Sequence, residues 1–172
     1  MAAPLIKNSP AEKKVMLISG MIGVFFLALD FATKFWVVNR FELYESMELI
    51  PGVFAFTSVR NTGAAWSILS GQVWLLFGIA LVALVLLMLF FRKICEGWPE
   101  RYIAAALLLA GIAGNAYDRA FRGAVVDFLH VHWYNVWHYP VFNVADIAIC
   151  CGAGLFILSN IFRKNPGQEE KK

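Results

Sequence analysis

The chain has 172 residues, of which 60% are hydrophobic and only 16% are charged, and its formal net charge is +3. Soluble domains carry about 25% charged residues, so this composition argues against a soluble domain and indicates a membrane protein. The positive charge is small and scattered, which argues against nucleic acid as a partner. The length predicts one domain covering residues 1–172.

Four apolar stretches predict membrane-spanning helices, because the hydrocarbon core requires roughly 20 apolar residues in a helix. In chain order they cover about residues 15–38, 72–91, 101–117 and 141–162. The first stretch could also be a cleaved signal peptide. Its apolar run continues past Asp30 and Lys34 without a small-residue cleavage site, which favours a retained span.

The distribution of Lys and Arg predicts the orientation of these spans. Ten basic residues lie in the N-terminal tail, the loop between the second and third spans, and the C-terminal tail: Lys7, Lys13, Lys14, Arg92, Lys93, Arg101, Arg163, Lys164, Lys171 and Lys172. The other two loops hold Arg40, Arg60, Arg119 and Arg122. We therefore expect a multi-pass membrane protein with cytoplasmic termini and with segments 39–71 and 118–140 outside.

The two outer segments differ in pattern. In the first, Pro51-Gly52 precedes an alternating, β-branched and aromatic run, which predicts a small sheet or β-cradle on the membrane surface. The second is rich in aromatic residues that favour the headgroup level, so we expect an interfacial helix or loop that could act as a lid. The expected fold class is an all-α polytopic membrane protein with four transmembrane helices, an extracytoplasmic β-cradle and this interfacial element.

Polar side chains in or beside the spans indicate a structural or functional role, because placing a charge near the membrane core costs free energy. They fall at the outward ends of the spans or in the outer segments, so they could share one layer: Asp30, Lys34, Asn61, Asn115, Asp118, Arg119, Asp127, Asn143 and Asp146. The i, i+4 spacing of Asp30 and Lys34 predicts an ion pair that orients the first helix. Asp118 either pairs with an arginine or contributes to a substrate contact.

Asp127 and Asp146 have no obvious local partner, since each stands in an apolar stretch. Two such carboxylates at one level could share a proton, because like charge raises one of the two pKa values. The pair could then activate a water for attack on a peptide carbonyl. The same acids could serve a proton relay or an ion site in a small transporter or membrane assembly factor. The chain lacks the internal repeats common in transporters, which favours the enzyme.

A metal protease is a further alternative, because His130, His132 and His138 lie close together in the sequence. They lack the helical HExxH pattern, and the flanking Trp and Tyr residues are typical of an interfacial loop, so no metal is expected. The three cysteines have neither disulfide nor zinc-site spacing.

Five separated blocks, in this order, resemble the lipoprotein signal peptidase (signal peptidase II) family. They are Asp30-Phe-Ala-Thr-Lys34, Asn61-Thr-Gly-Ala-Ala-Trp-Ser67, Gly111-Ile-Ala-Gly-Asn-Ala-Tyr-Asp-Arg119, Gly123-Ala-Val-Val-Asp-Phe128 and Phe142-Asn-Val-Ala-Asp146. Each block alone is weak, but five in order on four predicted spans are specific. The chain departs from the family at Ala110, where a second Gly is frequent, and at Ile147, where Ser is frequent.

The resemblance implies that Asp127 and Asp146 form the catalytic dyad of an aspartic endopeptidase. It also implies a set of substrate-binding residues and a set of supporting polar residues: Asn61, Gly63, Asn115, Arg119 and Asn143 for the first, and Asp30, Lys34 and Asp118 for the second. The implied substrate is a diacylglyceryl-modified prolipoprotein, met among the membrane lipids and cleaved just before its lipidated cysteine, and the implied inhibitor type is the cyclic peptide globomycin. No cofactor is expected, and nothing in the sequence requires a dimer, so we expect a monomer.

Overall fold

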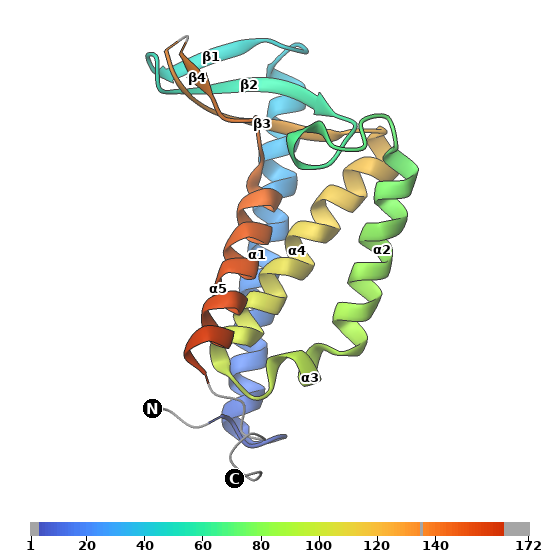
Figure 1. Cartoon of the computed structure of the whole chain (residues 1–172), viewed down its shortest axis with the longest axis vertical. Coiled ribbons are helices and arrows are strands. Elements are labelled where there is room, and N and C mark those ends of the chain that lie inside the picture. Colours follow the sequence, from blue (N-terminus) through green and yellow to red (C-terminus); the bar gives the residue numbers. More distant parts are fainter. Residues whose placement is uncertain (1–3, 135, 164–172) are drawn as a thin grey trace.

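The computed structural model describes residues 4–134 and 136–163. Lys164, Lys171 and Lys172, which contribute to the predicted orientation, lie outside the described residues. Four long helices run side by side, and a small antiparallel sheet covers one end of them (Figure 1). The first helix begins and the last helix ends at the opposite end of the molecule.

The long helices are α1 (Pro10–Arg40), α2 (Val73–Leu89), α4 (Pro99–Arg122) and α5 (Val144–Phe162), and the short α3 (Phe91–Cys95) joins α2 to α4. Helix α4 is central, because it packs against α1, α5 and α2. By length and composition α1 and α5 could each cross a membrane, and α2 is a shorter apolar helix of 17 residues.

Local sequence signals set the ends of these helices. Ser9 caps α1 by accepting the backbone N–H of Glu12 at 3.1 Å, and Pro99 opens α4 at a position where its missing N–H costs no helical hydrogen bond. Gly123 ends α4 in the left-handed region at φ 72°, which glycine adopts without a Cβ clash. This stop turns the chain from α4 into the strand that carries Asp127.

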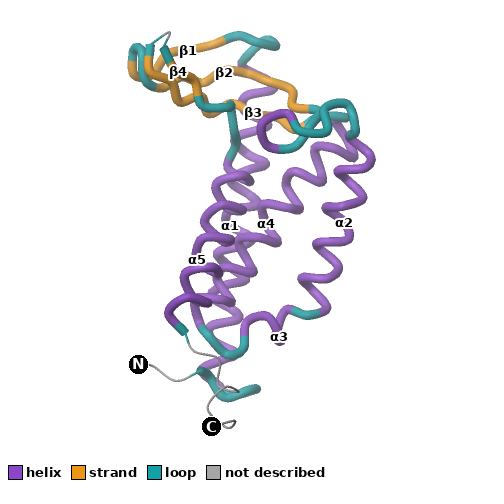
Figure 2. The backbone as a smooth tube through the Cα atoms, in the orientation of Figure 1, coloured by secondary structure: helices purple, strands orange, loops and turns teal. Residues whose placement is uncertain are grey.

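The sheet has the order β1-β2-β3-β4 with antiparallel neighbours, formed by β1 (Ser46–Ile50), β2 (Phe54–Asn61), β3 (Val125–Trp133) and β4 (Trp137–His138) (Figure 2). Segment 39–71 supplies β1 and β2, and a short 3-10 turn (η1, Ala65–Ser67) follows them. The expected interfacial helix or loop over 118–140 is wrong for most of that segment, because α4 continues to Arg122 and β3 pairs with β2. The expected small β-cradle is therefore a four-stranded sheet to which both outer segments contribute.

An apolar core joins the sheet to the helices, and its buried members come from α1, β3 and the start of α5: Val37, Phe41, Val126, Phe128 and Val144. Phe128, an aromatic residue of the second outer segment, is only 2% exposed and belongs to this core rather than to the expected interface. Burying an apolar side chain of this size stabilises a fold by about 1.5–3 kcal/mol. The core therefore holds β3 against α5 where Asp127 and Asp146 lie.

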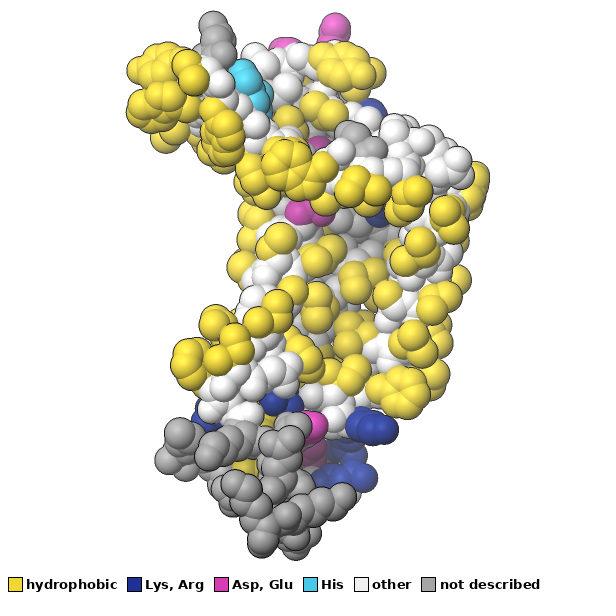
Figure 3. Space-filling view, in the orientation of Figure 1, with side chains coloured by type: hydrophobic (Ala, Val, Ile, Leu, Met, Phe, Trp, Pro, Cys, Tyr) yellow, Lys and Arg dark blue, Asp and Glu magenta, His cyan; other side chains and the backbone are white. Residues whose placement is uncertain are grey.

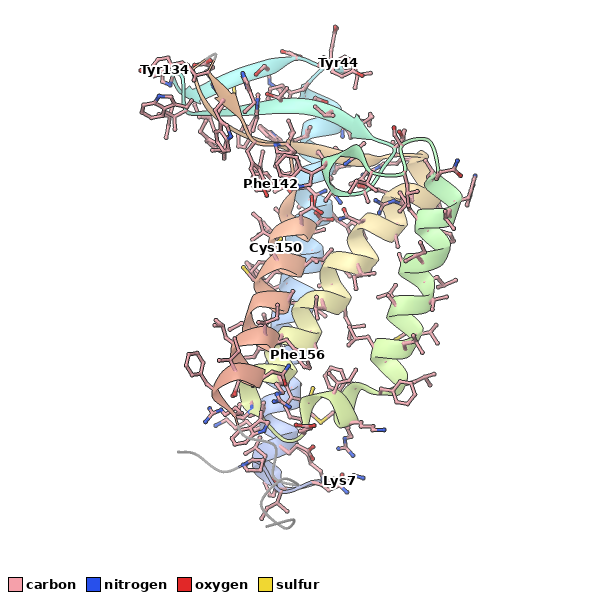
Figure 4. All side chains as sticks on the ribbon, in the orientation of Figure 1. Lys7, Tyr44, Tyr134, Phe142, Cys150 and Phe156 are labelled. Atoms are coloured by element: carbon pink, nitrogen blue, oxygen red, sulfur yellow. The ribbon has the colours of Figure 1, made fainter. Side chains whose placement is uncertain are left out.

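The outer surface of the helices is apolar. Figure 3 shows hydrophobic side chains over the middle of the helical part, and Lys and Arg side chains gathered toward the end opposite the sheet. On α2, Trp74 is 70% exposed and Leu89 is 73% exposed, which suits contact with lipid better than contact with water. Tyr44 and Tyr134 mark opposite ends of the sheet, and Lys7 lies at the far end of the molecule (Figure 4).

Candidate functional site

A cavity of about 630 Å³ lies beneath the sheet, with α2 on one side and α4 and α5 on the other. Figure 1 shows α2 standing apart from α5 at this level. Both Asp127 and Asp146 line the cavity, together with Asn61, Asn115 and Arg119. Its wall on α2 is apolar and consists of Leu76, Ile79, Ala80 and Ala83. The cavity therefore joins a polar end under the sheet to an apolar flank.

Asp146 is positioned by the first turn of α5. The side-chain oxygen of Asn143 accepts the backbone N–H of Asp146 at 2.9 Å, and a carboxylate oxygen of Asp146 accepts the backbone N–H of Asn143 at 3.1 Å. This reciprocal capping box satisfies two N–H groups that have no partner within the helix. The carboxylate is therefore held at the N-terminus of α5, where the helix dipole stabilises negative charge.

Asp127 is positioned by the pairing of β3 with β2. It lies opposite Val59 in the register, and only 2% of its surface is exposed. One of its carboxylate oxygens accepts the side-chain amide of Asn61 at 3.0 Å, and the other accepts that of Asn143 at 2.7 Å. Because the two donors come from β2 and from the start of α5, the sheet and the helix fix this side chain together.

Asn143 links the two acids. Its side-chain amide donates to Asp127, and its backbone N–H and side-chain oxygen bond to Asp146. Among the residues that the structure describes, neither carboxylate forms a salt bridge with Lys, Arg or His. Two carboxyl groups that share one asparagine and face one cavity can share a proton.

The pKa of Asp127 is raised to about 7, first because burial disfavours its charged form and second because the negative charge of Asp146 lies nearby. The amides of Asn61 and Asn143 act in the opposite direction, since they donate to the ionised carboxylate. Near neutral pH both the protonated and the ionised forms of Asp127 are therefore accessible.

Arg119 and Gly63 connect α4 to the turn that follows β2. The Arg119 guanidinium donates to the carbonyl oxygen of Gly63 at 2.8 Å and to that of Asn115 at 3.3 Å. The side-chain oxygen of Asn61 accepts the N–H of Gly63 at 2.9 Å, which leaves the amide nitrogen of Asn61 facing Asp127. Of the sequence-predicted substrate-binding residues, the structure thus places Asn61, Asn115 and Arg119 in the polar wall of the cavity, whereas Gly63 and Asn143 are not among its lining residues and bond to members of this wall.

Lys34 lies at the centre of a buried polar cluster behind this wall. Its ammonium nitrogen is 2.8 Å from Asp30, 2.9 Å from Asp118 and 3.0 Å from the side-chain oxygen of Asn115. The side chains of Lys34, Asp30 and Asp118 are all 0% exposed. Asp118 also accepts from Arg122 at 2.6 Å and from a backbone N–H of β3 at 3.1 Å. Both carboxylate oxygens of Asp118 are therefore engaged within the fold.

Two glycines of α4 permit close packing behind the site. A Cβ atom on Gly111 would collide with the carbonyl oxygen of Ala145, and one on Gly114 would lie 2.5 Å from a carboxylate oxygen of Asp30. Asp30 in turn accepts the backbone N–H of Ala145 at 2.9 Å. The space at Gly114 is therefore used by the buried acid cluster and by α5.

The three histidines lie on the sheet, outside the residues that line the cavity. The ring centroids of His130, His132 and His138 are 4.9 to 5.7 Å apart. Burial, and then the two neighbouring histidines, lower the pKa of His130. Within residues 4–134 and 136–163 no group of three His, Cys, Asp or Glu side chains is arranged to hold a metal ion.

Sequence analysis does not identify several residues of this site. The capping box could have been found, because an Asn three residues before an acid at a helix start is its known signature. The wall on α2 could not, because α2 is apolar all round and shows no distinct face. Trp66 and Tyr139 also line the cavity, with ring centroids 5.9 Å apart, and only the fold brings these two residues together.

Comparisons with known proteins agree over most of the chain. Residues 22–162 match a family model described as signal peptidase (SPase) II. The chain is 38% identical over 150 residues to a lipoprotein signal peptidase of Bacillus velezensis, covering 87% of this chain and 97% of that protein. It is 43% identical over 142 residues to a lipoprotein signal peptidase of Haemophilus ducreyi, covering 80% and 87%. A solved structure described as a bacterial membrane enzyme matches with a TM-score of 0.79 and 35% identity, covering 90% of this chain and 93% of that one.

Proposed function

We propose, from the premise that this chain belongs to the signal peptidase II family, that it removes the signal peptide from diacylglyceryl-modified prolipoproteins with a water activated by Asp127 and Asp146. Family membership makes the chain a membrane protease and does not favour a transporter or an assembly factor. The observation that carries the dyad is the bridge through Asn143 between two carboxylates of one cavity.

In the proposed reaction Asp127 holds the shared proton and Asp146 is ionised. Asp146 removes a proton from a water, and the water oxygen attacks the scissile carbonyl carbon, while Asp127 gives its proton to the carbonyl oxygen. Asp146 then passes its proton to the leaving amine as the C–N bond breaks, and the diol returns a proton to Asp127. The raised pKa of Asp127 and the N–H donors around Asp146 support this division of roles.

The polar wall is the proposed binding site for the peptide around the scissile bond. Its lining residues are Asn61, Asn115 and Arg119, and Gly63 and Asn143 complete the proposed substrate-binding set. The apolar flank on α2 is the proposed site for the acyl chains of the lipidated cysteine. Two features support this arrangement: the cavity contacts both walls, and its polar end lies directly beneath the sheet. A substrate anchored in the bilayer could then enter sideways between α2 and α5.

The proposed topology has a single membrane-embedded domain over residues 1–172 with α1, α2, α4 and α5 as its four spans. Both termini lie in the cytoplasm of a bacterium, and the sheet and the active site lie at the outer face of the inner membrane. The gathering of Lys and Arg away from the sheet supports this orientation (Figure 3). A monomeric state remains a prediction.

A cleavage assay with the purified protein tests the proposed function. A peptide with a diacylglyceryl-cysteine is compared with the same peptide without lipid, each with and without globomycin. We expect cleavage just before the cysteine of the lipidated peptide only, blocked by globomycin and unaffected by a metal chelator. Equal cleavage of both peptides would contradict the proposed substrate class, and loss of activity with a chelator would contradict the metal-free mechanism.

A further inference from the structure

We propose that Lys34 is a positioning residue for the reaction, because its ammonium group fixes the orientation of the Asn115 amide and thereby aims an N–H donor at Asp146. The inference rests on the proposed function of Asp127 and Asp146. Lys34 itself is not among the residues that line the cavity, and its hydrogen-bonded link to the site runs through Asn115.

The contacts of Lys34 fix the position of its ammonium group. An ammonium group has three donors and no acceptor. Its partners are carboxylate oxygens of Asp30 at 2.8 Å and Asp118 at 2.9 Å, and the side-chain oxygen of Asn115 at 3.0 Å. With the Lys34 side chain 0% exposed, these three contacts match its three donors away from bulk solvent.

The amide of Asn115 can satisfy its neighbours in one orientation only. Its oxygen accepts from Lys34 and also from the side-chain nitrogen of Asn143 at 3.1 Å. The orientation of Asn143 is fixed in turn, because its own oxygen accepts the backbone N–H of Asp146. If the Asn115 amide were reversed, its NH₂ group would face the donors of Lys34 and Asn143.

The fixed orientation of the Asn115 amide determines what its nitrogen contacts. Its amide nitrogen donates to a carboxylate oxygen of Asp146 at 2.8 Å, while the second oxygen of Asp146 accepts the N–H of Asn143. A reversed amide would place a carbonyl oxygen against this carboxylate. Lys34 therefore keeps the Asn115 donor on Asp146, beside the N–H of Asn143, and so fixes the orientation of the proposed proton acceptor.

The charged groups around the dyad come from several elements. Lys34 approaches from α1 and Arg119 from α4, and both act on Asp127 or Asp146 at a distance without pairing with either. Arg60 of β2 lines the same cavity. Because these groups remain in place when Asn115 is changed, a comparison of variants can separate the bare charge of Lys34 from its effect on the amide.

A double-mutant cycle in an Asp30→Asn background tests the proposal. This substitution removes one negative charge, which offsets the positive charge lost when Lys34 is replaced. Asp30→Asn keeps an acceptor for Ala145, and Asp118 keeps its bond to Arg122 when Lys34 is removed. We expect Lys34→Met in this background to lower kcat at least about tenfold with KM little changed, and to move the pH profile of kcat. In a background that also contains Asn115→Ala, the same change should lower kcat less than about twofold.

An equal effect of Lys34→Met with and without Asn115 would overturn the proposal, as would unchanged kcat and an unchanged pH profile in a folded variant. If the Met variants do not fold, ¹⁵N NMR of otherwise intact protein decides. The Nζ signal of Lys34 should shift in Asn115→Ala, and the side-chain amide signal of Asn115 should shift in Asp146→Asn. Absence of either shift would overturn the proposal.

The failure of this inference is distinguishable from failure of the proposed function. If the effects of Lys34→Met and Asn115→Ala on kcat are additive while activity still requires Asp127 and Asp146, only the proposed role of Lys34 is wrong. Wild-type protein that fails to cleave the lipidated peptide removes the proposed function itself.

Discussion

The side-chain nitrogen of Asn143 lies 2.7 Å from a carboxylate oxygen of Asp127, and the same residue caps α5, whose third residue is Asp146. One side chain thus joins the end of the sheet pairing to the start of α5. The separation between the two acids depends on this joint, and so does the local stability of α5.

Asn143→Ser separates these two roles. Serine still caps the helix but cannot reach Asp127, so we expect the free energy of unfolding to fall by about 1–3 kcal/mol, from the lost buried amide hydrogen bonds and not from the cap. We expect kcat to fall at least about tenfold, because a preorganised donor is lost. In the matched variant Asn143→Ala, the free energy of unfolding should be about 1 kcal/mol lower than in Asn143→Ser. Thermal unfolding and cleavage assays measure both effects, and a serine variant with wild-type kcat would contradict the bridging role.

The raised pKa of Asp127 predicts a pH dependence of stability. Its ordinary pKa is 3.8 and its pKa in the fold is about 7, so the folded chain binds this proton more tightly. The resulting stabilisation is fully present below about pH 4 and is lost as pH rises through about 7. Asparagine does not titrate, so the Tm of Asp127→Asn should gain on that of wild type between about pH 5 and pH 8. A Tm difference that is constant over this range would contradict the raised pKa.

Helix spacing predicted part of the site well. The Asp30–Lys34 contact follows from two positions one turn apart, and the apolar stretches correspond to the four long helices. The contact between Asn115 and Asp146 joins residues 31 positions apart on two packed helices, and no local pattern encodes it. Predicting this contact requires knowledge of how the two helices pack.

The segment after α4 carries two sequence signals, one typical of a membrane interface and one typical of a β-strand. Its aromatic residues favour a membrane interface, yet Val125, Val126 and Phe128 are buried members of β3. Strand formation prevails because β2 pairs with Val125–Val131 across one register shift and because Gly123 stops the helix. A sequence pattern shows that a residue is apolar, but the neighbouring elements determine whether it faces lipid or core.

Close packing of α4 against α5 predicts a strong effect of Gly111→Ala. The added Cβ would meet the backbone of α5 at Ala145, which cannot move alone, so we expect destabilisation of about 1–3 kcal/mol. Gly154→Ala is the matched control, because nothing lies within 4 Å of its Cβ position, and it should be neutral or stabilising by up to about 1 kcal/mol. Thermal unfolding compares the two variants, and equal stability would contradict the tight contact.

The apolar flank predicts a specific effect on lipid binding. Ala80→Phe would narrow the cavity beside α2, and we expect KM for the lipidated peptide to rise about tenfold with kcat less affected. Leu81→Phe, one position along the same helix and 49% exposed, changes an outward-facing residue and should leave KM within about twofold. If both variants behave alike, the acyl chains do not lie in this part of the cavity.

The central claim is that Asp127 and Asp146 act as one acid–base pair, and cleavage of the lipidated peptide by Asp127→Asn and Asp146→Asn tests it most directly. Each variant keeps the shape of the side chain, so unfolding should still be cooperative while kcat falls by at least about a thousandfold. If either variant folds and still cleaves within about tenfold of the wild-type rate, that residue is not part of a catalytic dyad and the account is wrong.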